Sequence, residues 1–131
     1  MATGDESVVL TSLTDGRRTD PNASPVWEAV VTWGYDLDDA GAEALAISEL
    51  NGILLKVVLV LPATTTTGTT WQMLIKDNGD HTVFDSGEVA ENGTHTFNLF
   101  EPLCGDIDVS IEPSAAAGTS GSIPIATLRG I

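Results

Sequence analysis

The sequence predicts an all-β fold: an antiparallel β-sandwich of jelly-roll-like form, with about eight strands and an N-terminal arm. Short segments in which apolar and polar residues alternate recur along the chain, which is the pattern of half-buried strands. Turn signals such as Asn-Gly separate these segments, and threonine and glycine, the latter at 13 residues, are abundant. A parallel α/β fold would require helices between the strands, and the pattern does not contain them.

Length and composition indicate a single folded domain preceded by the arm. The chain has 131 residues, and 42% of them are hydrophobic, which is enough to bury a core. Residues 1–25 are predicted to form the arm, because the stretch from Thr14 to Pro25 consists mostly of turn and loop residues. Within the arm, residues 8–13 have the apolar character of a short strand. Residues 26–131 form the predicted sandwich domain.

The first strand of the sandwich is predicted over residues 26–35. Strict alternation there puts five large or apolar side chains on one face: Trp27, Ala29, Val31, Trp33 and Tyr35. The segment Asp36–Ala46 that follows opens with acidic residues, as helix N-termini do, but it contains Gly41 and few large apolar residues. We expect at most one or two helical turns there, or an acidic loop.

A hairpin is predicted over residues 47–61. The pair Asn51-Gly52 separates a short apolar segment from Ile53–Leu61, and Asn-Gly suits the positive φ angles of a type I′ turn. Ile53–Leu61 is apolar on both faces apart from Lys56, which predicts a central strand whose second face is covered by a partner or by the arm. Pro62 ends this strand.

The second half of the chain alternates between strands and turns. A Thr-rich loop at 63–70 is followed by a strand with Trp71, Met73 and Ile75 facing inward, and a turn at Asp77–Asp80 leads into a returning strand. We expect a longer loop at Asp85–Gly93. Further strands are predicted at Thr94–Phe100 with His95, Phe97 and Leu99 on one face, at Asp106–Glu112 with Ile107, Val109 and Ile111 facing inward, and at Ser122–Arg129 with Ile123 and Ile125 on one face.

The charge of the chain excludes several partners. Five Lys and Arg against 19 Asp and Glu give a net charge of −14, which repels nucleic acid and opposes binding to anionic membranes. The N-terminus lacks the features of a signal peptide, and no apolar run approaches the length of a membrane span, so we expect a soluble protein. Cys104 is the only cysteine, so an intrachain disulfide is impossible. We expect Cys104 to be a small buried hydrophobic residue in a protein made in a reducing cytosol.

Motifs that carry chemistry are weak. The two histidines, His81 and His95, do not form a zinc motif, and we interpret His95 as a core residue bonded to the backbone. The oxygen-rich segments Asp36–Asp39 and Asp77–Asp80 are better explained as turns than as calcium loops. We therefore predict no catalytic residue, no metal ligand and no cofactor. The three tryptophans could line a sugar platform, but their places in apolar alternation favour the core: Trp27, Trp33 and Trp71.

The stretch from Leu50 to Ile131 resembles a group of small virion proteins of tailed bacteriophages, those of the capsid decoration, cement or head-stabilising type. The matching features are the strand with one basic residue at Asn51–Pro62, the Thr-rich loop, strand and acidic turn at Thr69–Asp80, the segment Val83–Gly87, the strand at Gly105–Ile111, and the terminal strand ending at Arg129.

This resemblance implies a non-enzymatic β-sandwich that binds the major capsid protein on the capsid exterior and bridges capsomers, commonly as a homotrimer. It implies a virion location for a protein made in the host cytoplasm. Alternatives are a structural protein of the phage neck or tail, and a carbohydrate-binding β-sandwich module. The candidate partner-binding residues are the basic ones, Arg17 and Arg18 in the arm and Lys56 in the central strand.

Overall fold

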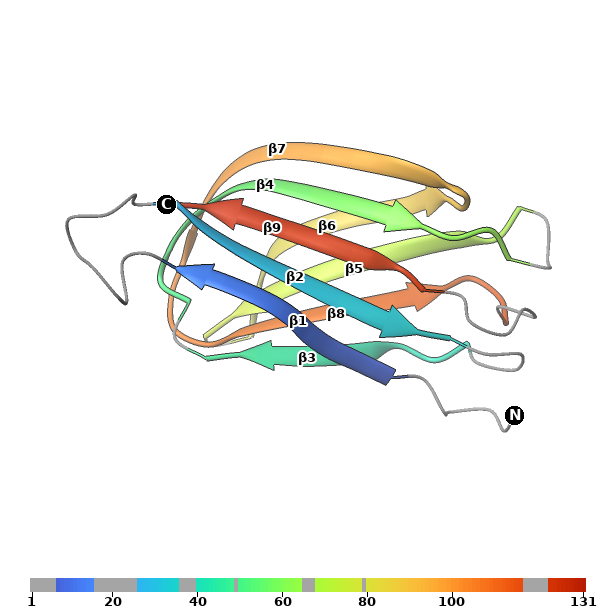
Figure 1. Cartoon of the computed structure of the whole chain (residues 1–131), viewed down its shortest axis with the longest axis horizontal. Coiled ribbons are helices and arrows are strands. Elements are labelled where there is room, and N and C mark those ends of the chain that lie inside the picture. The colour runs from blue at the N-terminus through green and yellow to red at the C-terminus, as the bar shows by residue number, and fades with distance from the viewer. Residues whose placement is uncertain are drawn as a thin grey trace.

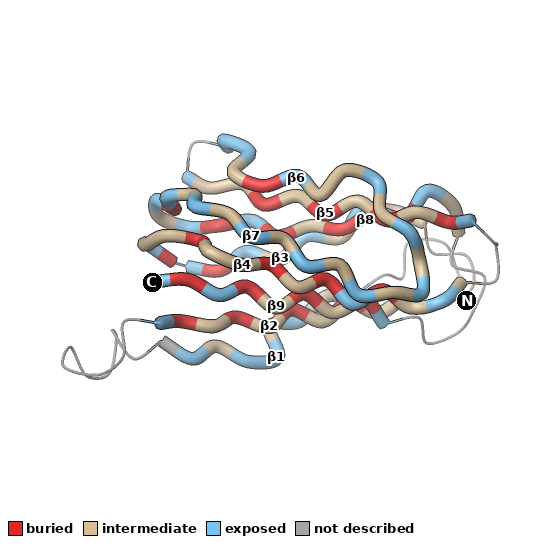
Figure 2. The backbone as a smooth tube through the Cα atoms, turned by 90° about the horizontal axis from the view of Figure 1, so that it is seen from above, coloured by how far each residue is buried: buried red, intermediate tan, exposed pale blue. Residues whose placement is uncertain are grey.

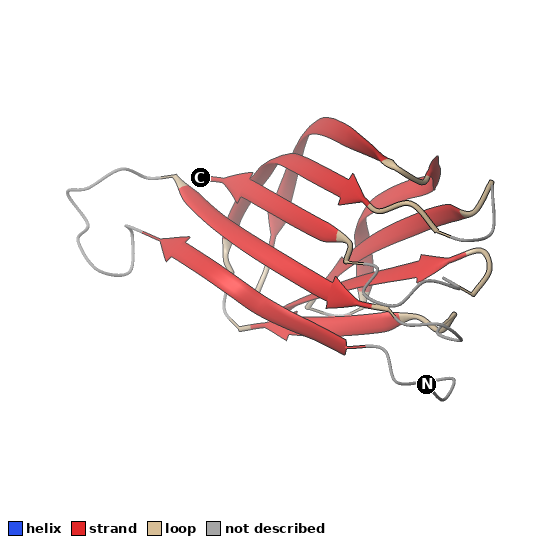
Figure 3. Ribbon diagram, turned by 45° about the vertical axis from the view of Figure 1, so that its right-hand side comes forward, coloured by secondary structure: helices blue, strands red, loops and turns tan. Residues whose placement is uncertain are grey.

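The computed structural model describes residues 7–15, 26–35, 40–48, 50–64, 68–78, 80–116 and 123–131. These residues form nine β-strands and no helix, so none of them forms a helix able to span a membrane (Figures 1 and 3). The strands are β1 Ser7–Asp15, β2 Trp27–Gly34, β3 Glu43–Ile47, β4 Gly52–Leu61, β5 Thr70–Asp77, β6 His81–Ala90, β7 Gly93–Leu103, β8 Ile107–Pro113 and β9 Ile125–Gly130.

The strands form two layers (Figure 1). One sheet has five strands in the order β1-β2-β9-β4-β7, and the other has four in the order β3-β8-β5-β6. Antiparallel pairs are nested from the outside inward: β2 with β9, β3 with β8, β4 with β7, and β5 with β6. This is the course of one long hairpin folded over on itself, which is the jelly-roll topology. The predicted fold class is confirmed.

The core lies between the two sheets, and strand alternation builds it (Figure 2). In β2 every second residue is buried, and the same holds in β8, where Ile107, Val109 and Ile111 are buried. The inward positions predicted in β5 are confirmed. Tyr35 meets Trp71 edge to face, with ring centroids 5.2 Å apart and an interplanar angle of 85°. This contact joins the two layers where β2 ends and β5 begins.

Strand β1 extends the five-stranded sheet at its edge. It pairs with β2 along its whole length, from Ser7 opposite Gly34 to Asp15 opposite Trp27, with one irregularity between Leu10 and Ser12. Part of the segment that the sequence places in an arm is therefore a sheet strand. The remainder, residues 1–6 and 16–25, lies outside the described residues.

The predicted hairpin at 47–61 is wrong, because its two arms belong to different sheets. β3 pairs with β8, whereas β4 pairs with β7 and β9. The connection crosses between the layers and is held by Gly105: the Leu50 N–H donates to the Gly105 carbonyl (3.0 Å), and the Gly105 N–H donates to Asn51 Oδ1 (2.7 Å). Gly52 has a φ of 148°, outside the range of a type I′ turn. The prediction that β4 is an interior strand is confirmed.

Two further segments differ from expectation. The helical turns or acidic loop expected at Asp36–Ala46 give way to β3 from Glu43 onward, while residues 36–39 lie outside the described part. The loop expected at 85–93 is mostly strand, because β6 continues to Ala90. The turn-forming residues of this segment interrupt the regular pairing of β6 with β5. Gly87 has a φ of 65°, and its N–H donates to Asp85 Oδ1 (2.8 Å).

Candidate interaction faces

The outward residues of the five-stranded sheet form regular rows, and together they are called the five-stranded face below. The register of the four strands β2, β9, β4 and β7 defines the rows. Each row has one residue at the position of each strand, in the order β2, β9, β4 and β7. Starting at the C-terminal end of β9, the rows are Val26, Ile131, Ile53 and Pro102; then Glu28, Arg129, Lys56 and Asn98; then Val30, Thr127, Val58 and Thr96; and then Thr32, Ile125, Val60 and Thr94.

The exposed hydrophobic side chains gather on this face. Six large hydrophobic residues of the described part are exposed, by 39% to 69%. Three of them are outward residues of β1, β4 and β7, and the other three lie just beyond the ends of β2 and β9. They are Val9, Val26, Val60, Phe100, Ile123 and Ile131. Ile123 and Ile125 thus share a face as predicted, and it is the outer one, since Ala126 and Leu128 fill the core. Val26, Phe100 and Ile131 lie toward one end of this face and Val9, Val60 and Ile123 toward the other, with the row of Glu28, Arg129, Lys56 and Asn98 between the two groups.

Three charged side chains lie on the five-stranded face, and all occupy one row. The Arg129 Nε donates to Glu28 Oε2 at 2.7 Å, which makes an ion pair across β2 and β9. Lys56 stands between Arg129 and Asn98 in the register and forms no ion pair with another described residue. The other two predicted partner-binding residues, Arg17 and Arg18, lie outside the described residues.

The outer face of the four-stranded sheet is acidic. Its outward positions include four carboxylates, from Asp85 and Glu88 on β6 and from Asp108 and Glu112 on β8, against one cation, Lys76. The Gln72 amide donates to Asp85 Oδ1 (2.9 Å), and this bond, with a second from the Gly87 N–H, lowers the pKa of Asp85 below its ordinary value. This sheet therefore presents a solvated anionic surface.

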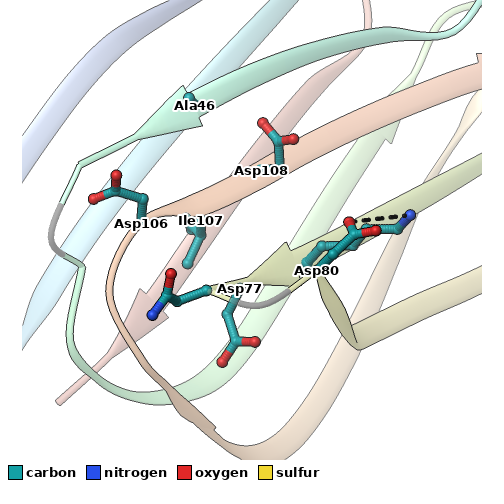
Figure 4. A pocket seen from close by; sticks show the side chains of 8 residues that line it. Ala46, Asp77, Asp80, Asp106, Ile107 and Asp108 are labelled. Atoms are coloured by element: carbon teal, nitrogen blue, oxygen red, sulfur yellow. Dashed lines mark ion pairs between the residues drawn. The ribbon is translucent and has the colours of Figure 1, made fainter.

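A shallow hollow of about 290 Å³ lies at one end of the acidic face (Figure 4). Asp77, Asp80, Asp106 and Asp108 line it together with Ala46, Lys76, Asn78 and Ile107. Lys76 Nζ lies 3.6 Å from Asp80 Oδ1, and Asp77, Asp106 and Asp108 point in different directions. No group of three or more His, Cys, Asp or Glu side chains within the described ranges could hold a metal ion. The segment Asp77–Asp80 closes the turn between β5 and β6, and the Asp80 N–H donates to the Asp77 carbonyl (2.9 Å).

The prediction for Cys104 is wrong, because its side chain is exposed. Leu103 fills the last buried position of β7, and Cys104 follows it in the connection to β8. The Cys104 backbone is engaged on both sides, since its N–H donates to Asp77 Oδ2 (3.2 Å) and its carbonyl accepts from the Asn78 N–H (3.0 Å). The residue before the cysteine thus takes the core position that we assigned to the cysteine.

The tryptophans and histidines that could carry chemistry differ in their surroundings. Trp27, Trp33 and Trp71 are each at most 1% exposed, so none of them offers a face to a sugar ring. His95 Nε2 lies 2.8 Å from the Ala90 carbonyl oxygen, so the predicted bond to the backbone is present, but His95 is only half-buried and not the core residue that we expected. His81 is exposed at the start of β6. No tryptophan platform exists in this protein.

No protein-family model matches the chain, and no curated protein sequence matches it. Solved structures resemble it in fold at low sequence identity. An endospore appendage of Bacillus, described as a disulfide-linked pilus, shares 16% identity over 99% of this chain and 93% of its own, with a TM-score of 0.47. A xylan-binding domain from CBM 22 shares 13% over 98% of this chain and 84% of its own, with a TM-score of 0.48.

A D431N mutant VP2 protein of infectious bursal disease virus shares 16% identity over 98% of this chain but only 32% of its own, with a TM-score of 0.42. At such identities and TM-scores, these likenesses carry no conclusion about the function of this chain. The fold and its two faces define this chain as a jelly-roll β-sandwich with one hydrophobic and one acidic outer surface.

Proposed function

We propose that this chain is a non-enzymatic structural protein of a bacteriophage virion, which binds the exterior of the capsid and stabilises it by bridging capsomers. The observation that carries the proposal is the separation of surface types on the sandwich: all six exposed large hydrophobic residues of the described part lie on the strands of the five-stranded sheet or just beyond their ends. Four outward carboxylates and one lysine project from the other. A protein that is attached on one side and solvated on the other is built in this way.

The acidic side suits a location on the outside of a particle. The net charge of −14 keeps the chain from competing for a packaged genome, and an anionic outer surface stays solvated. The similarity of Leu50–Ile131 to small virion proteins of tailed phages supports the same role.

The proposed partner is the major capsid protein, and the proposed state is a homotrimer. Arg17 and Arg18 supply positive charge in the sequence after β1, and Lys56 supplies it on the five-stranded face. Cations in an otherwise acidic chain give docking electrostatic specificity. A partner that bears carboxylates is repelled by the acidic groups and attracted by the cations. We propose these three residues as capsid or neighbour contacts.

Electron microscopy of the purified parent particle tests this function. We expect density for the sandwich on the outer surface of the shell, at positions between capsomers, and its loss from particles produced without this chain. Particles without it should also release their genome at a lower temperature. Density confined to the neck or tail would show that the chain belongs to that part of the particle and not to the capsid. Absence of the chain from the particle would refute the proposal.

A further inference from the structure

We infer that the free edge of β1 binds an extended segment of a second protein, which joins the five-stranded sheet as an additional strand. β1 pairs with β2 and with no other strand of the described residues, so one side of its backbone is open. Adding a strand to such an edge is a recurrent mode of peptide binding, in which main-chain hydrogen bonds hold the peptide. We take the segment to belong to the shell protein, and only that source rests on the proposed function.

The register shows which backbone groups face the open edge. The Trp33 N–H donates to the Pro124 carbonyl (2.9 Å), on the β9 side of β2, and the backbone groups of successive residues in a strand point to opposite edges. Those of Thr32 therefore point toward β1, where they meet the groups of its register partner Val9. The same alternation applies on both sides of the irregularity in β1. The N–H and C=O groups that point to the open edge are accordingly those of Val8, Leu10 and Leu13.

Three of the four edge strands carry features that discourage strand addition, and β1 lacks them. β3 has only five residues, the pairing of β6 is interrupted twice and β6 carries Asp85 and Glu88, and β7 contains Pro102, which has no N–H. Short length, charges and prolines are the means by which proteins keep an edge from pairing. β1 has one irregularity, but Ser7–Thr14 contains no charged residue and no proline. Of the four edges, β1 is therefore the one best suited to pairing.

The side of the sandwich next to this edge is incompletely covered. β1 and β3 lie side by side there, each at the edge of its sheet (Figure 1). Four apolar side chains of these strands pack against the core but stay partly exposed: Val8, Leu10, Leu13 and Leu45. On the opposite side of the sandwich, Phe84 of β6 and Phe97 of β7 meet edge to face, with ring centroids 5.1 Å apart. A strand added to β1 would cover the four apolar side chains, as the two rings cover the other side.

These features define the chemistry of the segment. Its backbone must be extended, since only an extended chain presents N–H and C=O groups at matching intervals. Its side chains at alternate positions should be apolar, because they would lie over the partly exposed side chains of β1 and β3. Its charge should be neutral or positive: β1 and β3 carry Asp15 and Glu43 and no cation, in a chain whose net charge is −14.

The probe for this edge is a synthetic peptide of alternating threonine and valine with a lysine at each end. Amide NMR spectra of the full chain, recorded with up to about 2 mM peptide, should show shifts and slower hydrogen exchange at Val8, Leu10 and Leu13. Val8→Pro removes one N–H from the open edge and leaves the hydrogen bonds to β2 intact, so it should weaken binding at least about 10-fold. Leu10→Lys places a charge at the edge and should act similarly, which provides a second variant in case Val8→Pro folds poorly.

The matched control is Ser110→Lys, which adds the same charge at an outward position of β8, inside the other sheet. It should change the affinity by less than about twofold. Absence of binding, or binding that neither edge variant weakens, would overturn the inference. Shifts at β1 that appear with rising chain concentration and no peptide would also overturn it, because a second copy would then be the occupant.

Cosedimentation with particles produced without this chain tests the source of the segment. The wild-type chain should bind these particles, and Val8→Pro and Leu10→Lys should bind them at least about 10-fold more weakly. Equal binding of all three would refute the shell protein as the source. A chain that takes up the peptide but does not bind the particles would refute the proposed function and support β1 as a strand-binding edge.

Discussion

Gly130 lies directly over the indole ring of Trp27, at the point where β9 passes between β2 and β4. An alanine methyl group at position 130 would come within 2.5 Å of Trp27 Cζ2 and 2.1 Å of the Ile53 carbonyl oxygen. Trp27 is fully buried and its partner in the register is Gly130, so neither the ring nor the backbone can retreat. The absence of a side chain at Gly130 therefore makes room for the largest side chain of the core.

Gly130→Ala is accordingly expected to destabilise the fold by about 1–3 kcal/mol, the usual cost of overpacking a core. Thermal unfolding measures the effect as a lower Tm. Gly93→Ala is the matched control, since its added methyl would meet nothing closer than 3.8 Å and should change stability by less than about 0.5 kcal/mol. Equal Tm values for the two variants would contradict this account of Gly130.

Substitutions at the contact between Tyr35 and Trp71 measure hydrogen bonding and ring packing separately. The Tyr35 hydroxyl lies 2.6 Å from the Gly41 carbonyl oxygen and 3.2 Å from that of Ile111. Tyr35→Phe keeps the edge-to-face contact and should cost about 1 kcal/mol, whereas Trp71→Ala leaves a cavity and should cost about 3–5 kcal/mol. Urea unfolding monitored by circular dichroism gives both values. A Tyr35→Phe loss as large as that of Trp71→Ala would show that the hydroxyl dominates.

Glu91 should make the loop between β4 and β5 sensitive to acid. Its Oε2 accepts from the Thr64 N–H (2.7 Å) and from the Thr64 hydroxyl, and its Oε1 accepts from the Gly68 N–H (3.3 Å). These bonds, led by that from the Thr64 hydroxyl, lower the pKa of Glu91 below its ordinary value. The stabilisation is therefore present above the unfolded-state pKa and is lost as the pH falls through the folded-state pKa.

We expect amide exchange at Gly68 to speed up on acidification, relative to its intrinsic rate, in the wild-type chain but not in Glu91→Gln, which lacks the charge at every pH. Glu88→Gln serves as the comparison, because Glu88 is exposed on β6, just before Glu91, and its carboxylate accepts no hydrogen bond from a described residue. An unchanged acid response in Glu91→Gln would exclude this carboxylate as the cause.

Cys104 should react with a thiol reagent in the folded protein, because its side chain is exposed. One equivalent of thiol is expected to react with Ellman's reagent without denaturant. Cys104→Ser should leave Tm unchanged within the effect of about 0.5 kcal/mol typical of surface substitutions. Reaction only after denaturant is added would show that the thiol is buried, as the sequence alone predicts.

Local pattern determined those parts of the fold in which one face of a strand is buried. The alternation of β2 and of β8 predicted their inward residues, because a strand that packs on one side must place apolar residues at every second position. The turn Asp77–Asp80 was predicted correctly for a related reason: the strands on either side of it pair with each other.

The pair Asn51-Gly52 shows where local pattern fails. Asn-Gly favours a hairpin, but Ile47 pairs with Ile107 and Leu61 pairs with Gly93, and these partners come much later in the chain. Ladders formed with distant strands outweigh the preference of a two-residue turn. Cys104 was misassigned for a similar reason, since the end of β7 decides which of two adjacent apolar residues enters the core.

The sequence by itself determined the fold class, the inward residues of most strands, the tryptophan core and the acidic character of the chain. These follow from composition and from a period of two residues, which any sandwich must obey. Only the tertiary structure decided the pairing of the strands, and with it the rows in which Val60, Phe100 and Ile131 share one surface while Asp85 and Asp108 share the other. Residues that lie far apart in the chain become neighbours through the nested ladders of the jelly roll, and no local period encodes that order.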